Sequence, residues 1–170
     1  MLARGLATAA LVALFDQLSK LAVRHFFAAH AAGYQLFKIT SFFDLVHTYN
    51  HGMSFGLFDR GPAVDAVLFS AVAVAIIAVL LTWLRRVRHP LLAVAIGLII
   101  GGAVGNVIDR LRLGGVLDFL YFHLPVMTCV NGYGTLWDGC WPAFNLADAA
   151  ICVGVAAMLL DGLLLHRQAH

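Results

Sequence analysis

Two aspartates stand apart in this sequence because basic neighbours along the chain explain them least. Asp118 lies in the segment Val116–Phe119, and Asp148 has no Lys or Arg within one helical turn. Two carboxylates brought together in a partly dry site cannot both ionise easily, so they share a proton. One then acts as general base to a water, and the other as general acid to a scissile carbonyl and its leaving amine. The pair therefore indicates the chemistry of an aspartic protease.

The elements that position these aspartates must lie in a membrane. Of the 170 residues, 62% are hydrophobic and only 12% are charged, whereas about 25% is usual for soluble domains. So few charges exclude the soluble and the disordered classes of protein. The net charge of +2 is too small and too dispersed for nucleic-acid binding.

Four apolar segments are long enough to cross a bilayer, which needs roughly 20 residues per helix. We predict transmembrane helices at about residues 5–26, 64–84, 91–109 and 143–165, within a single domain, 1–170. The first segment contains Asp16 and Lys20, and no convincing cleavage site follows it, so we do not interpret it as a removable signal peptide. The fold class is an all-α integral membrane protein.

The charge pattern predicts the direction of these helices. The connector at 85–90 carries Arg85, Arg86 and Arg88 and no acid, which marks it as cytoplasmic and places both termini on that side. The segments at about 28–62 and 111–141 then lie outside. The first is rich in aromatic and β-branched residues, which predicts one or two strands followed by a short interfacial helix near Met53–Phe58.

With this topology, three helices bring their polar residues to one level near the outer leaflet. The residues are Asp16, Lys20, Asn106, Asp109, Arg110, Asn145 and Asp148. Neutral pairs such as Asp16 with Lys20, Asp109 with Arg112 or Arg110 with Asp118 would explain some of them, as would hydrogen bonds between helices. Convergence of the whole set favours a functional site, because ionisable residues in membranes mark such sites.

Glycines and cysteines allow two interpretations each. Gly97, Gly101 and Gly105 recur every four residues, and we favour close helix packing over a smooth face for a substrate helix. Cys129 and Cys140 both lie in the second outer segment, and the sequence leaves open whether they form a disulfide. The eight histidines show no paired ligand spacing, so we expect no metal site.

Five motifs in order resemble those of the bacterial lipoprotein signal peptidases (signal peptidase II), an aspartic membrane peptidase family. They are Asp16-Gln17-Leu18-Ser19-Lys20, Tyr49-Asn50-His51-Gly52-Met53-Ser54-Phe55, Gly101–Arg110, Val116–Phe119 and Pro142–Asp148. The resemblance implies four transmembrane helices, a small periplasmic β-cradle and a short interfacial helix. It also implies an enzyme of the cytoplasmic (inner) membrane that removes signal peptides from prolipoproteins, cutting before a diacylglyceryl-modified Cys at the outer leaflet.

By the same motif match, the resemblance implies that Asp118 and Asp148 are catalytic and that no metal or cofactor is used. The supporting positions are Asp16, Lys20, Asn50, Gly52, Gly105, Asn106, Arg110, Asn145 and Ala147. Two features depart from the family pattern, a longer loop at 126–141 and His51, where a small or hydroxylated residue is expected. A monomer is expected, since one chain supplies every site residue.

Two other functions remain as alternatives. A small proton- or ion-coupled transporter would distribute its charges across the whole membrane depth, with broken helices at the midplane. Here the inner halves of the helices are nearly empty of charge, with Asp161 as the exception. A structural membrane subunit would not need ionisable aspartates at 118 and 148.

Overall fold

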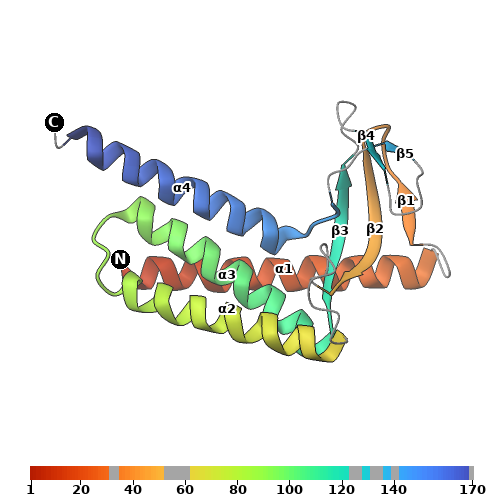
Figure 1. The fold of residues 1–170 in the computed structure, drawn as a ribbon, viewed down its shortest axis with the longest axis horizontal. Helices are drawn as coiled ribbons and strands as arrows, with labels where there is room; N and C mark the ends of the chain where they lie inside the picture. The colour runs from red at the N-terminus through yellow and green to blue at the C-terminus, as the bar shows by residue number, and fades with distance from the viewer. Residues whose placement is uncertain (31–34, 52–61, 123–127, 131–135, 139–141, 169–170) are drawn as a thin grey trace. The chain divides into compact units, whose positions relative to one another are not determined.

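A computed structural model describes residues 1–30, 35–51, 62–122, 128–130, 136–138 and 142–168 (Figure 1). The elements in chain order are α1 (Leu2–His30), β1 (Leu36–Lys38), β2 (Phe43–Asn50), α2 (Pro62–Leu84), α3 (Pro90–Leu113), β3 (Val116–Phe122), β4 (Thr128–Val130), β5 (Leu136–Asp138) and α4 (Leu146–Gln168). Within these ranges, four helices are long and apolar enough to cross a membrane. This confirms the predicted fold class, an all-α membrane protein with a small sheet.

The chain forms two compact units. The helical unit contains residues 1–19, 50–116 and 146–170, and the sheet unit contains residues 20–49 and 117–145. Each unit is described on its own below. The predicted interfacial helix near 53–58 lies outside the described residues.

Helix α3 is the centre of the helical unit and lies between α2 and α4 (Figure 1). In its most apolar window 67% of the residues are buried, against 17–22% in the other three helices. Glycines let the neighbouring backbones approach it. A Cβ on Gly97 or Gly101 would collide with the α1 backbone at Gly5 or Ala9, and one on Gly154 would collide with the α3 backbone at Ala95. The glycine repeat is therefore a packing surface, as the favoured interpretation predicted.

The ends of α3 have local causes. Pro90 occupies the first helical turn, where its missing N–H leaves no donor unpaired. Gly114 ends the helix in the left-handed conformation, with φ 75°, and its N–H donates to the Arg110 carbonyl at 3.1 Å. The helix thus continues past the predicted end at 109, because Arg110 and Arg112 extend its last turn beyond the apolar span and favour its negative end.

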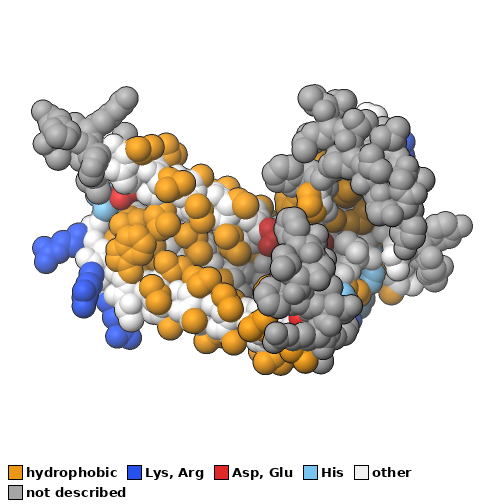
Figure 2. Space-filling model, viewed as in Figure 1, with side chains coloured by type: hydrophobic (Ala, Val, Ile, Leu, Met, Phe, Trp, Pro, Cys, Tyr) orange, Lys and Arg blue, Asp and Glu red, His pale blue; other side chains and the backbone are white. Residues whose placement is uncertain are grey.

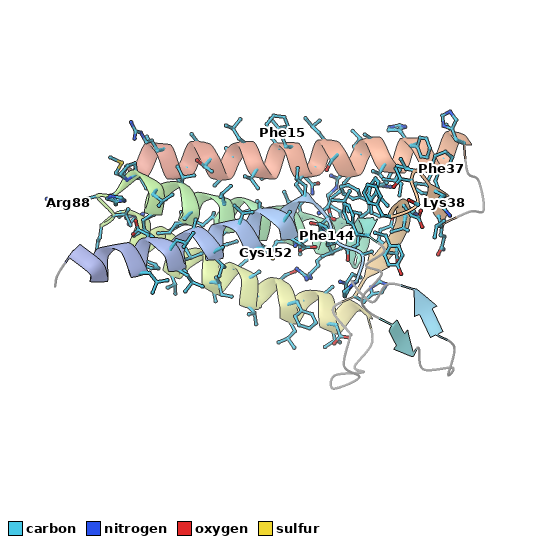
Figure 3. All side chains as sticks on the ribbon, turned by 90° about the horizontal axis from the view of Figure 1, so that it is seen from above. Phe15, Phe37, Lys38, Arg88, Phe144 and Cys152 are labelled. Atoms are coloured by element: carbon cyan, nitrogen blue, oxygen red, sulfur yellow. The ribbon has the colours of Figure 1, made fainter. Side chains whose placement is uncertain are left out.

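The face of the helical unit that Figure 2 shows is apolar along its length and basic at one end. Large apolar side chains such as Leu14, Val67 and Leu159 are more than half exposed. Such exposure suits contact with lipid. The basic end is where the α2–α3 connection lies and where α1 begins and α4 finishes (Figure 1), with Arg88 labelled there in Figure 3. At this end His89 Nδ1 lies 3.0 Å from the buried carboxylate of Asp161.

The sheet unit is built on a three-stranded sheet with the order β1-β2-β3. Strands β1 and β2 are antiparallel, with Phe37 opposite Leu45, which confirms the strands predicted in the first outer segment. Val23, Phe27 and Phe119 form the buried core of this unit, and Phe26, Leu45 and Leu120 pack against it. Strands β3, β4 and β5 were not predicted individually from the residues; β4 and β5 form a separate two-stranded sheet.

Helix α4 begins at Leu146, three residues later than the predicted start at 143. The cause is a backbone pairing that holds the preceding residues extended. Phe144 forms an isolated antiparallel bridge with Leu120 of β3, with N–H to carbonyl distances of 2.9 and 3.0 Å. A residue paired in this way cannot also donate along a helix.

Candidate active site

Asp118 is held in the sheet unit by a neighbouring amide. It lies on β3 with 2% of its surface exposed, and Asn145, which is fully buried, donates from Nδ2 to its Oδ1 at 2.7 Å. The bridge between Leu120 and Phe144 brings Asn145 alongside β3. A buried carboxylate requires such donors, because burial without hydrogen bonds is costly.

Asp148 is held in the helical unit by an equivalent contact. It lies in the first turn of α4, it is half-buried, and Asn106 of α3 donates from Nδ2 to its Oδ1 at 2.8 Å. Gly102 makes this approach of α3 to α4 possible, since a Cβ there would collide with the Ala147 carbonyl oxygen. The position also favours a carboxylate, because the partial positive charge of a helix lies at its N-terminus.

Asp16 connects α1 with the start of α4. Its Oδ1 accepts the Ala147 N–H at 3.0 Å, and the side chain is fully buried. The adjacent Gln17 donates from Nε2 to Asp16 Oδ2 at 3.2 Å and to Asp109 Oδ1 at 3.0 Å. Gly105 is required beside them, since a Cβ at that position would collide with the Asp16 carboxylate. Asp16 is thus close enough to the first turn of α4 to fix its geometry.

The remaining expected site residues have different surroundings. The Arg110 guanidinium lies 5.7 Å from the centre of the Phe69 ring, a cation–π distance. Lys20 is buried on α1 with 3% of its surface exposed. Asn50 is exposed at the end of β2, and Gly52 lies outside the described residues.

His51, the unexpected residue in its motif, contacts the turn that follows α3. Its Nδ1 lies 3.1 Å from the Gly114 carbonyl oxygen, so that the ring nitrogen donates when it carries the proton. A side chain at Gly115 would collide with the His51 ring. His51 therefore helps to hold the α3–β3 turn, a role that a small residue would not fill.

The sequence predicted no metal site and left a disulfide between Cys129 and Cys140 open. Among the described residues, no group of three or more His, Cys, Asp or Glu could hold a metal ion. Cys129 lies opposite Trp137 in the β4–β5 backbone register, and Cys140 lies outside the described residues, so their disulfide stays a prediction. Cys152 is a free, exposed thiol on α4.

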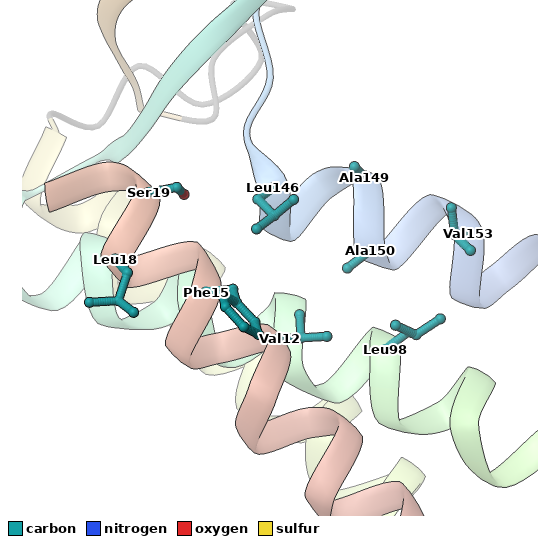
Figure 4. Close-up of a pocket in the computed structure, with 9 residues that line it drawn as sticks. All are labelled: Val12, Phe15, Leu18, Ser19, Leu98, Leu146, Ala149, Ala150 and Val153. Carbon is teal, nitrogen blue, oxygen red and sulfur yellow. The ribbon is translucent and has the colours of Figure 1, made fainter. Parts of the chain in front are cut away.

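An apolar pocket of about 660 Å³ lies between α1, α3 and α4 (Figure 4). Its lining residues are Val12, Phe15, Leu18, Ser19, Leu98, Leu146, Ala149, Ala150 and Val153. The one hydroxyl among them, on Ser19, donates to the Asp16 carbonyl at 2.7 Å. None of these described lining residues is an acid or a base.

In the sheet unit, His47 lies on β2, outside the membrane spans. Partial burial, and then the positive charge of Arg24, hold the pKa of His47 below its ordinary value of 6.5. The ring lies 5.5 Å from the Phe27 ring, centre to centre, and 5.3 Å from that of Tyr49. His47 is thus favoured in its neutral form within an aromatic cluster.

Four membrane helices, with carboxylates that asparagine amides hold in place, define a polytopic membrane enzyme. The chain belongs to the signal peptidase II family, because the model of that family, described as signal peptidase (SPase) II, matches residues 8–164. It is similar to the lipoprotein signal peptidase of Rhodopseudomonas palustris (strain TIE-1), 41% identical over 94% of this chain and 92% of that protein. The lipoprotein signal peptidase of Paraburkholderia phytofirmans (strain DSM 17436 / LMG 22146 / PsJN) is 42% identical over 95% of this chain and 86% of that protein.

A solved structure agrees on the fold. A bacterial membrane enzyme determined by the in meso method at 1.9 Å resolution superposes with a TM-score of 0.70 at 24% identity, covering 94% of this chain and 92% of that one. The family makes this chain a peptidase of a bacterial membrane, crossing it several times, and nothing in the relatives or the structure favours the transporter alternative.

Gln17 is the site-region residue that the sequence did not single out. It lies inside a matched motif, between Asp16 and Lys20, yet only the structure shows its contact with Asp109 across 92 positions of sequence. An amide within a membrane span was the available signal, because polar side chains there form hydrogen bonds between helices. Asp65 and Ser70 on α2 are also buried.

Proposed function

We propose that this chain removes the signal peptide from prolipoproteins and that Asp118 and Asp148 are its catalytic pair. The observation that carries the pair is the short chain between Asn145, the partner of Asp118, and Asp148. Asn145 donates to Asp118, and only Leu146 and Ala147 separate Asn145 from Asp148. Three Cα–Cα steps reach at most about 11 Å. This covalent link supports a site in which both carboxylates act on one peptide bond.

The two amide contacts suit this mechanism, since each amide donates to one oxygen of its carboxylate and holds it in place. One aspartate, ionised, accepts a proton from a water whose oxygen attacks the scissile carbonyl carbon. The other, protonated, donates to the carbonyl oxygen, giving a tetrahedral diol. Collapse of the diol breaks the C–N bond: the departing nitrogen takes the proton that the first aspartate received from water, and a diol hydroxyl returns a proton to the second aspartate. The products are a carboxyl-ended signal peptide and a new amino terminus.

The family and the charge pattern support a substrate class and a place in the membrane. We expect a prolipoprotein cut before a diacylglyceryl-modified Cys, at the outer leaflet of the cytoplasmic membrane. The basic α2–α3 connection, with Arg85, Arg86 and Arg88 exposed, supports a cytoplasmic position for that end and for both termini. One chain is expected to suffice, because it carries both carboxylates.

The test is a cleavage assay in nanodiscs with one prolipoprotein, offered with and without its diacylglyceryl Cys. Wild type is compared with Asp118→Asn, Asp148→Asn and Asp161→Asn. The last variant makes the same change on α4 at a buried acid that contacts His89, and serves as the control.

We expect wild type and Asp161→Asn to cut only the lipidated substrate, and Asp118→Asn and Asp148→Asn to cut neither form. Cleavage of the unlipidated form at an equal rate would contradict the substrate class. Retained cleavage in both site variants would contradict the catalytic pair.

A further inference from the structure

Gln17 joins two buried carboxylates on different helices of the helical unit. Its Nε2 lies 3.2 Å from Asp16 Oδ2 on its own helix, 3.0 Å from Asp109 Oδ1 and 3.2 Å from the Gly105 carbonyl oxygen on α3. Asp16 is fully buried and Asp109 is 3% exposed. The amide thus bridges the two buried carboxyl groups and the α3 backbone.

The three partners of the Gln17 nitrogen are all acceptors, and this fixes the orientation of the amide. The Gly105 carbonyl can only accept, and carboxylate oxygens accept when ionised, so the NH₂ group and not the amide oxygen faces α3. A neutral donor is suited to this place, because it satisfies both acids without adding charge.

The contact continues from Gln17 to the first turn of α4. Gln17 holds one oxygen of Asp16, and the other oxygen accepts the Ala147 N–H at 3.0 Å. Ala147 directly precedes Asp148, whose Oδ1 accepts from Asn106 at 2.8 Å. The direction of the Asp16 carboxylate therefore sets where the backbone of this turn lies, and with it the Asp148 side chain.

We propose that Gln17 is a positioning residue for Asp148, acting through Asp16 and the Ala147 N–H; the proposal rests on the catalytic role of Asp148 proposed above. Displacement of a catalytic group by as little as an ångström can lower a rate on the order of 10²-fold. Loss of the bridge should therefore lower kcat and leave KM nearly unchanged.

The test compares kcat and KM in nanodiscs for Gln17→Met, Gln17→Glu and Gln35→Glu. Methionine keeps the length of the side chain and removes the donors, and glutamate sets a third carboxylate against Asp16 and Asp109. Gln35 is an exposed amide at which the same change to glutamate serves as the control.

We expect Gln17→Met to lower kcat by about 10-fold to 100-fold with KM within about two-fold, Gln17→Glu to lower it further, and Gln35→Glu to match wild type. Adding Asp109→Asn to Gln17→Glu puts an amide donor at position 109 opposite the new carboxylate at position 17. This double variant should recover part of the lost kcat. An unchanged kcat in Gln17→Met, or a loss confined to KM, overturns the proposal, as does Gln17→Glu being no worse than Gln17→Met.

A second readout does not depend on activity. Amide hydrogen exchange at Ala147 should be faster in Gln17→Met than in wild type or Gln35→Glu, and equal exchange overturns the proposal. If the methionine variant does not fold, Gln17→Asn, which keeps a shorter amide, carries both measurements. Asp148→Asn separates the two proposals: if it still cleaves, the catalytic role fails, and if it is inactive while Gln17→Met is unaffected, only the positioning role fails.

Discussion

At the scale of single residues, neutral amides orient the proposed catalytic acids. Asn145 donates to Asp118 and Asn106 donates to Asp148 at nearly equal distances, 2.7 and 2.8 Å. An asparagine suits this role because it satisfies a carboxylate without bringing a compensating charge that would fix the acid as ionised.

His47 should make the free energy of unfolding depend on pH. Burial and Arg24 lower the pKa of folded His47 below 6.5. Between the lowered pKa and 6.5 the unfolded chain binds more protons, so the free energy of unfolding decreases as the pH falls through that window. NMR titration of His47 in detergent should give a midpoint below 6.5 that rises in Arg24→Gln. A midpoint at or above 6.5 in wild type contradicts this account.

At the scale of elements, glycines set the spacing of the helices. A Cβ on Gly101 would lie 2.6 Å from the Ala9 carbonyl oxygen and 2.7 Å from Val12 Cβ, and one on Gly102 would collide with the Ala147 carbonyl. These glycines hold α1 and α4 against the buried helix α3. The helices that carry Asp16, Asn106 and Asp148 are therefore spaced by backbone contact, and their side chains meet without long bridging groups.

We predict that Gly101→Ala destabilises the protein and that Gly162→Ala does not. Overpacking of this kind costs about 1–3 kcal/mol, whereas among the described residues no atom outside the neighbouring turns of α4 lies within 4 Å of a Cβ at Gly162. Both changes gain the same helix propensity, about 1 kcal/mol, so their difference isolates the packing. The measurement is thermal unfolding in one detergent. Equal unfolding midpoints in the two variants would show that α1 and α3 can move apart without loss of stability, which contradicts the prediction.

At the scale of the whole molecule, the sequence predicted the four membrane spans because their apolar length has few alternatives in a chain with 12% charged residues. It located the ends of the helices less well. The extended residues before Leu146 depend on a pairing of Phe144 with β3, and the end of α3 depends on Gly114, not on the last apolar residue.

The same limit applies to the site. Motifs identified Asp16, Asn106 and Asn145 as supporting residues, since their types recur in a recognisable order. Which atom each one contacts could not be predicted, because contacts such as Ala147 with Asp16 join positions 131 residues apart. Gln17 was missed for this reason, although it lies next to a residue that was named.

The measurement that tests the central claim most directly is the cleavage rate of the double variant Asp118→Asn/Asp148→Asn on the diacylglyceryl-modified prolipoprotein, beside each single variant. Residues that act as one catalytic unit are strongly non-additive. We predict that either single change removes cleavage and that the double variant is no slower than the singles. Partial losses in the single variants that multiply in the double variant would show two independent contributions and contradict a catalytic pair.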